Sequence, residues 1–89
     1  MTVGLEAALE LHPQVALRPE PFGALAYHYG NRRLTFLNDE RLLAVVRTAG
    51  DYDDVHDALA AAGVPEQQHA AYLVALGRLL EAEVLVASD

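Results

Sequence analysis

The spacing of hydrophobic residues changes partway along this chain. Up to Leu37, apolar and polar residues alternate in short runs, which is typical of β-strands. From Asn38 onward, apolar residues recur every three to four positions, which indicates helices. The pattern therefore predicts an α+β fold in which the strands come first.

Three strands are predicted in the first half of the chain. The run "QVALR" forms the first and is ended by "PEPFG". The runs "ALAYHY" and "RRLTFL" follow, joined by Gly30 and Asn31, a pair suited to a two-residue hairpin turn. Such a turn pairs Tyr27 with Leu34 and Leu25 with Phe36. We expect these four residues to form the buried face of an antiparallel sheet. The opposite face is thinner and mixed, with Ala24, Ala26, His28, Arg33 and Thr35.

Three helices are predicted in the second half. Asn38 or Asp39 can cap the first helix, which runs to Gly50. Asp53 can cap the second, with Val55 and Leu59 facing inward and Gly63 at its C-terminal end. Pro65 opens the third and longest helix, which runs to about Ala82. Three strands followed by three helices predict a winged helix-turn-helix-like domain.

The first residues are expected to form an N-terminal arm, residues 1–12. Its apolar residues fall at helical spacing between Leu5 and Leu11, which predicts a short turn of helix.

Composition restricts what such a domain can do. At 89 residues the chain is expected to form one domain, and its net charge of −7 with no lysine opposes nucleic-acid binding. There is no cysteine, which excludes disulfides and cysteine-ligated clusters and favours the cytoplasm. The N-terminus lacks a signal-peptide pattern, and no apolar run suits a membrane span.

No pattern for catalysis stands out. Ser88 is the only serine and has no candidate base nearby in sequence, and no phosphate-binding glycine loop is present. The four histidines are His12, His28, His56 and His69. They are not spaced as metal ligands, so we expect neither a metal nor a cofactor. By elimination the domain is predicted to be a binding module and not an enzyme.

The third predicted helix carries two adjacent apolar stripes. We expect one stripe to pack against the core, and it contains Leu73, Gly77, Leu80 and Val84. The other stripe, with His69, Tyr72, Leu76 and Leu79, either covers more core or lines a groove.

The segment "LHPQVALRPEPFGALAYHYGNRRLTFLNDERLLAVV" resembles the mycofactocin peptide chaperones (the MftB type), which are relatives of the PqqD protein of pyrroloquinoline quinone synthesis. The stretches "RPEPFGAL" and "RRLTFL" are the specific part of the match, while residues 51–89 match more loosely. The resemblance implies that residues 1–89 form a single PqqD-like domain, a RiPP recognition element. Such a domain binds the leader of a ribosomally made precursor peptide and presents it to a radical S-adenosylmethionine enzyme.

The resemblance also implies where the peptide binds. The leader would add as an antiparallel strand to the third predicted strand, at Arg32, Arg33, Leu34, Thr35, Phe36 and Leu37. The groove wall would come from the third helix, at Gln68, His69, Tyr72, Ala75, Leu76 and Leu79. Arg32 and Arg33 would keep the exposed edge from pairing with itself and attract acidic leader residues, although edge protection alone also explains them.

Two other functions fit the same predicted fold. A winged-helix DNA-binding regulator would need a basic third helix, whereas this one sets Arg78 against Glu66, Glu81 and Glu83. A small adaptor or dimerisation module would use an exposed apolar stripe equally well.

Overall fold

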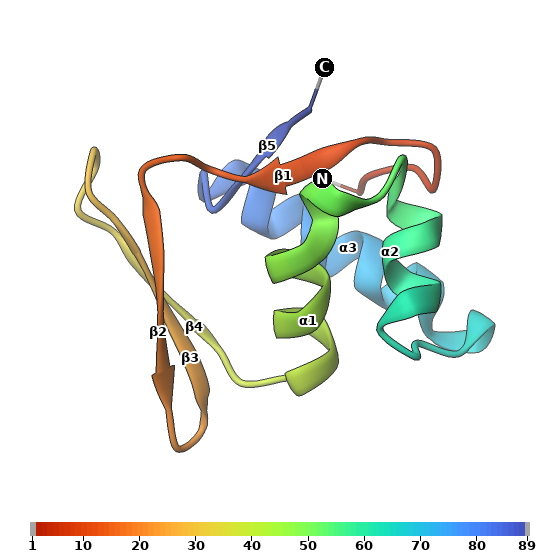
Figure 1. Ribbon diagram of the computed structural model, residues 1–89, viewed down its shortest axis with the longest axis horizontal. Helices are drawn as coiled ribbons and strands as arrows, with labels where there is room; N and C mark the ends of the chain where they lie inside the picture. Colours follow the sequence, from red (N-terminus) through yellow and green to blue (C-terminus); the bar gives the residue numbers. More distant parts are fainter. Residues whose placement is uncertain (1, 89) are drawn as a thin grey trace.

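The computed structural model describes residues 2–88 and confirms the α+β fold, with a three-stranded antiparallel sheet followed by three helices (Figure 1). A second, two-stranded sheet was not predicted. The strands are β1 (Leu9–Leu11), β2 (Val15–Glu20), β3 (Gly23–His28), β4 (Leu34–Leu37) and β5 (Leu85–Ala87). The α-helices are α1 (Glu40–Thr48), α2 (Val55–Ala61) and α3 (His69–Glu81), with short 3₁₀ turns at Ala49–Asp51 and Glu66–Gln68.

The three-stranded sheet has the order β2-β3-β4, and its predicted β3–β4 register is correct. Tyr27 lies opposite Leu34, and Leu25 lies opposite Phe36. Strand β2 pairs with the other side of β3. Both β2 and β4 are therefore edge strands.

The prediction of which sheet face is buried was wrong. Ala24 and Ala26 are each only 1% exposed, whereas Leu34 and Phe36 are 55% and 66% exposed. Helix α1 contacts β3 and β4, and the small alanine side chains let its backbone approach closely. The helices lie on one side of this sheet (Figure 1), so the larger apolar side chains, which alternate with the buried alanines, are left on the other side. We call this side the outer face; it carries Ala16, Arg18, Leu25, Tyr27, Leu34 and Phe36.

Gly23 allows the start of β3 to approach the end of β4. Its φ is +143°, and a Cβ atom there would collide with the carbonyl oxygen of Leu37. Gly63, after α2, also has a positive φ of +78°, but a Cβ atom there would meet no other atom within 4 Å.

We expect Gly23→Ala to be much more destabilising than Gly63→Ala. Both substitutions incur backbone strain of about 1–3 kcal/mol, but only the first forces two backbone segments apart. Urea denaturation of the two variants measures the difference. Equal losses of unfolding free energy would contradict a requirement for close approach at Gly23.

The helices begin and end close to where the sequence predicts. The Asp39 side chain caps α1 by accepting hydrogen bonds from the N–H groups of Arg41 and Leu42. Helix α2 is capped by Asp54 and not by the predicted Asp53, a difference of one residue. Gly63 has the expected positive φ.

The prediction of a helical turn within residues 5–11 was wrong. Strand β1 forms there and pairs antiparallel with β5, so that Leu9 faces Ala87 and Leu11 faces Leu85. The pairing places the first strand of the chain beside the last one, near α3 (Figure 1). The segment before β1 is also bonded to the helical half, since Leu5 accepts a hydrogen bond from the N–H of His56.

The core lies between the helices, the inner sheet face and β5, and α3 contributes to it the stripe for which core or groove had been left open. Leu76 is 0% exposed and Leu79 is 5% exposed, whereas Leu73 and Leu80 are only half-buried. Two adjacent apolar stripes look equivalent in the sequence, and the elements packed around α3 decide which one is covered. The stripe with Leu76 therefore covers more core, and Gly77 and Val84 of the other stripe are buried as well, so α3 has no separate core stripe and groove stripe.

Candidate functional site

The free side of β4 presents backbone groups for pairing with another strand. Hydrogen-bonded and non-bonded residue pairs alternate along an antiparallel ladder. The pair His28–Arg33 is hydrogen-bonded, with a distance of 3.0 Å between the His28 nitrogen and the Arg33 oxygen. Leu34 and Phe36 therefore belong to non-bonded pairs, and their N–H and C=O groups point away from β3. Within residues 2–88 no strand covers this edge.

The opposite edge of the sheet, on β2, offers fewer donors. A hydrogen bond of 2.8 Å from the Tyr29 N–H to the Gln14 carbonyl sets the alternation, so the backbone groups of Val15, Leu17 and Pro19 point away from β3. Pro19 has no N–H, and the N–H of Val15 already donates to His12 at 3.0 Å. Strand β4 is therefore the better of the two edges for strand addition.

The structure places four of the six predicted edge residues, Leu34 to Leu37, on β4. Leu34 and Phe36 are exposed, Thr35 is half-buried, and Leu37 is buried. Arg32 and Arg33 do not lie in the strand; both are exposed in the loop before it.

The predicted two-residue turn was also wrong, because a longer loop spans residues 29–32. The buried ring of His28 holds this loop, since its Nδ1 accepts hydrogen bonds from the N–H groups of Gly30 and Asn31, at 3.0 and 3.1 Å. The Asn31 side chain accepts a hydrogen bond from the N–H of Arg33, and Arg32 has a positive φ of 62°. These local bonds stabilise a wider turn than the Gly-Asn pair alone suggests.

A pocket of about 140 Å³ lies between the start of α1 and the middle of α3. Asp39 and Leu42 line it from the α1 side, and Ala71, Tyr72 and Ala75 line it from α3. Asp39 is separated from the end of β4 by one residue, so the pocket follows the β4 edge along the chain.

A hydrogen bond joins the two sides of the pocket. The Tyr72 hydroxyl donates to Asp39 Oδ2 at 2.8 Å, while Asp39 Oδ1 accepts the N–H groups at the start of α1. Burial by itself raises the pKa of Asp39, but the bonds from Leu42, Tyr72 and Arg41 outweigh it and hold this pKa below its ordinary value of 3.8. Burial, and then the Asp39 carboxylate, raise the pKa of Tyr72.

We expect Asp39 to stabilise the fold in a pH-dependent way. A carboxyl group whose folded pKa is depressed stabilises the fold above its unfolded pKa, and this contribution is lost as the pH falls through the folded pKa. Wild type should therefore exceed Asp39→Asn in stability at pH 7 and 5, and the gap should shrink as the pH falls below 3.8. Urea denaturation at each pH measures the gap. A gap that stays constant down to pH 2 would contradict this role.

The predicted groove residues divide into three groups. Tyr72 and Ala75 line the pocket, as expected of a groove wall. His69, Leu76 and Leu79 are buried, and the ring of His69 contacts the Val64 carbonyl at 3.1 Å. Gln68 is exposed in the 3₁₀ turn before α3. Leu76 and Leu79 therefore belong to the core, and the prediction that they form an open wall is corrected.

Three pocket residues were not predicted as site residues: Asp39, Leu42 and Ala71. The sequence did identify Asp39 as a helix cap, but its bond to Tyr72 joins residues 33 positions apart. No local pattern indicates such a contact.

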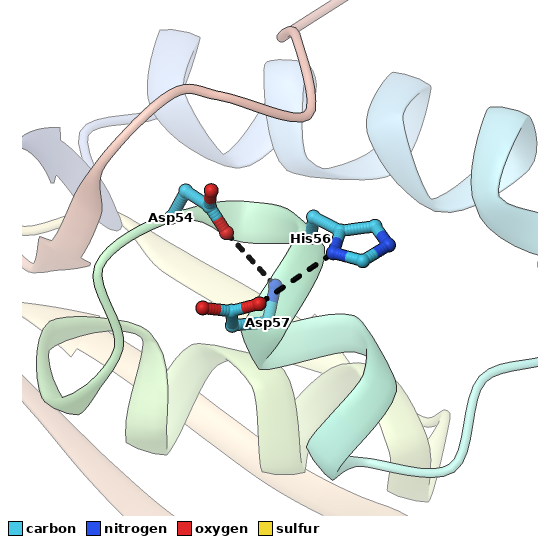
Figure 2. Close-up of side chains that lie close together, drawn as sticks. All are labelled: Asp54, His56 and Asp57. Atoms are coloured by element: carbon cyan, nitrogen blue, oxygen red, sulfur yellow. Dashed lines mark hydrogen bonds and ion pairs between the residues drawn. The ribbon is translucent and has the colours of Figure 1, made fainter.

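Three possible metal ligands lie close together at the start of α2 (Figure 2). Ligand atoms of Asp54, His56 and Asp57 lie within 4.8 Å of one another. Asp54 already caps the helix by accepting the N–H of Asp57 at 2.9 Å, and His56 Nδ1 lies 3.5 Å from Asp57 Oδ1. Helix capping and one exposed contact between His56 and Asp57 account for this arrangement.

The sequence profile of the peptide chaperone MftB family matches residues 8–86, which include every strand and helix except the last residue of β5. The chain belongs to this family. The match confirms the resemblance that "RPEPFGAL" and "RRLTFL" indicate and extends it over the helical half.

Curated MftB relatives support the assignment. The chain is 53% identical over 79 residues to the peptide chaperone MftB of Mycobacterium ulcerans, covering 89% of this chain and 72% of the relative. It is 48% identical over 86 residues to that of Mycolicibacterium smegmatis, covering 97% of this chain and 84% of the relative. The chaperone of Mycobacterium tuberculosis is 53% identical over 76 residues, which cover 85% of this chain and 70% of the relative. No solved structure matches the chain.

Across residues 2–88, every helix is too short or too polar to cross a bilayer.

Proposed function

We propose that this chain binds the leader of the mycofactocin precursor peptide and presents it to a radical S-adenosylmethionine enzyme, without catalysing a step itself. The observation that carries the proposal is the unpaired edge of β4, which leads into the Asp39–Tyr72 pocket. Membership in the peptide chaperone MftB family gives the class of ligand.

Strand addition is the mode of binding that this edge supports best. An incoming antiparallel strand would accept hydrogen bonds from the N–H groups of Leu34 and Phe36 and would donate hydrogen bonds to their carbonyl groups. Main-chain bonds of this kind provide affinity with little demand on sequence, while alternate side chains provide specificity.

The pocket is suited to one apolar side chain of the leader. Leu42, Ala71 and Ala75 supply apolar walls, and most of the hydrogen-bonding capacity of Asp39 is already used by α1 and Tyr72. A volume of about 140 Å³ is enough for one apolar side chain. The fixed Asp39–Tyr72 bond would preorganise the pocket before the peptide arrives.

Arg32 and Arg33 would act at the start of the same edge. Both are exposed beside β4, where they would attract acidic leader residues and discourage pairing between two copies of the edge. Exposed charges of this kind affect association rate and orientation more than final affinity.

The chemistry that the sequence offers supports the proposed non-catalytic role. The chain has no cysteine with which to hold an iron–sulfur cluster, so in this proposal the enzyme supplies the radical chemistry. The chaperone would raise the effective concentration of the peptide at the enzyme by binding both.

Fluorescence titration with the labelled precursor peptide tests the proposal, with a scrambled leader as the matched control. We expect saturable binding of the native leader and at least tenfold weaker binding of the scrambled one. Mass spectrometry should then show that the enzyme modifies the precursor faster when the chaperone is present. Equal binding of the two leaders, or modification by this chain alone, would refute the proposed function.

A further inference from the structure

The outer face of the three-stranded sheet is an exposed apolar surface. Leu34 and Phe36 are 55% and 66% exposed, and Phe22 and Tyr29 beside them are 46% and 62% exposed. The aromatic rings contact one another, since the Phe22 and Phe36 centroids lie 5.6 Å apart. Figure 1 shows the helices on the opposite side of this sheet, so within residues 2–88 none covers the surface. Contiguous exposed apolar surface of this kind is typical of interaction sites.

A hollow of about 430 Å³ runs across all three strands of this face. Its lining residues come from β2, β3, β4 and the hairpin loop: Ala16, Arg18, Leu25, Tyr27, Tyr29 and Leu34. A leader strand added to β4 extends the sheet in its own plane and does not cover this hollow. The outer face therefore remains available when the β4 edge is occupied.

The segment that forms the three-stranded sheet is basic in a chain that is otherwise acidic. Residues 15–37 contain three of the six arginines and a single acidic residue, a formal charge of +2, whereas the whole chain carries −7. The Arg18 side chain is 77% exposed, and Arg32 and Arg33 are exposed at the hairpin. Glu20, the one acidic residue, lies 3.5 Å from Arg18.

This charge pattern selects the kind of partner. An apolar centre with a basic rim is complementary to an apolar surface that carries carboxylates. A two-fold contact between identical outer faces would bring the same arginines of two copies onto one interface, which opposes a second copy as the occupant.

We propose that the outer face docks a folded protein surface with an apolar centre and an acidic rim, and that the partner is the modifying radical S-adenosylmethionine enzyme. This inference rests on the proposed function for the identity of the partner. Peptide and enzyme then occupy different surfaces of one sheet, the β4 edge and the outer face, and bind at the same time.

Charge reversal on β2, the strand farthest from the peptide edge, separates the two surfaces. Arg18→Glu reverses a charge in the lining of the hollow. Arg47→Glu is the charge-matched control, since Arg47 is exposed on α1. Each variant is titrated with labelled precursor peptide, and its association with the enzyme is measured by biolayer interferometry with and without saturating peptide. We expect Arg18→Glu to weaken enzyme association at least tenfold and peptide affinity less than twofold, and Arg47→Glu to change neither by more than twofold. Tyr29→Ser, at another exposed position in the hollow, should reproduce the Arg18→Glu result.

Other outcomes overturn the inference and are distinguishable from failure of the proposed function. If Arg18→Glu and Tyr29→Ser both bind the enzyme as tightly as wild type does, the outer face does not dock the enzyme. The same conclusion holds if wild type does not bind the enzyme at all. A parallel loss of peptide affinity would make the face part of the peptide site. A wild-type dimer that Arg18→Glu converts to a monomer would identify a second copy as the occupant. If wild type binds the enzyme but not the peptide, the proposed function fails while the enzyme measurements still test the outer face.

Discussion

Leu76→Ala is expected to lower the free energy of unfolding by about 2–5 kcal/mol, the range for truncating a buried leucine. Leu76 lies in the middle of α3 with no exposed surface, surrounded by the core. Removing its branched end leaves a cavity that the surrounding helices cannot fully close. Urea denaturation followed by circular dichroism measures the loss.

Leu73→Ala is the matched comparison, since it makes the same chemical change one turn away on a half-buried side chain. We expect it to cost clearly less than Leu76→Ala, because less of its apolar surface is removed from water. The opposite order would restore the original expectation that the stripe with Leu73 packs the core and the stripe with Leu76 faces a groove.

Phe36→Pro is expected to weaken binding of the precursor leader at least tenfold relative to Phe36→Ala. Both substitutions remove the ring, but only proline removes the N–H group that points away from β3. Leaving a peptide carbonyl without its partner costs about 1–3 kcal/mol, and 1.4 kcal/mol corresponds to a factor of ten. Titration with labelled precursor peptide measures both affinities.

The comparison depends on both variants being folded. Position 36 lies on an edge strand with its N–H outside the sheet, where proline is tolerated. The two variants should therefore show similar thermal unfolding midpoints. Equal peptide affinities in two folded variants would show that the leader does not pair with the backbone of β4.

Features set by local chemistry could be predicted from the sequence. The β3–β4 register follows from the alternation of side chains on either side of the hairpin, and it survives a turn of a different length. Asp39 and Gly63 mark helix ends through capping and positive φ, which involve only neighbouring residues.

Features set by packing between distant segments could not be predicted from the sequence. The helices cover the face with Ala24 and Ala26, because small residues allow close approach, whereas a count of apolar side chains favours the other face. Strands β1 and β5 are three residues each and lie at opposite ends of the sequence, so neither gives a clear alternating pattern. Their pairing depends on the completed fold.

The candidate site was predictable in the same uneven way. The strand edge follows from strand order, so Leu34 to Leu37 were placed on it correctly. The pocket requires Asp39 and Tyr72 to meet across the fold, a contact that no spacing rule supplies. Tyr72 and Ala75 were proposed as groove residues, but the residues that face them from α1 were missed.

Amide hydrogen exchange with and without the precursor peptide tests the central claim most directly. If the leader adds as a strand to β4, the amides of Leu34 and Phe36 become protected when peptide binds, while the amide of Leu17 on β2 is unchanged. Protection confined to β2, or none at either edge in a saturated complex, would contradict strand addition at β4.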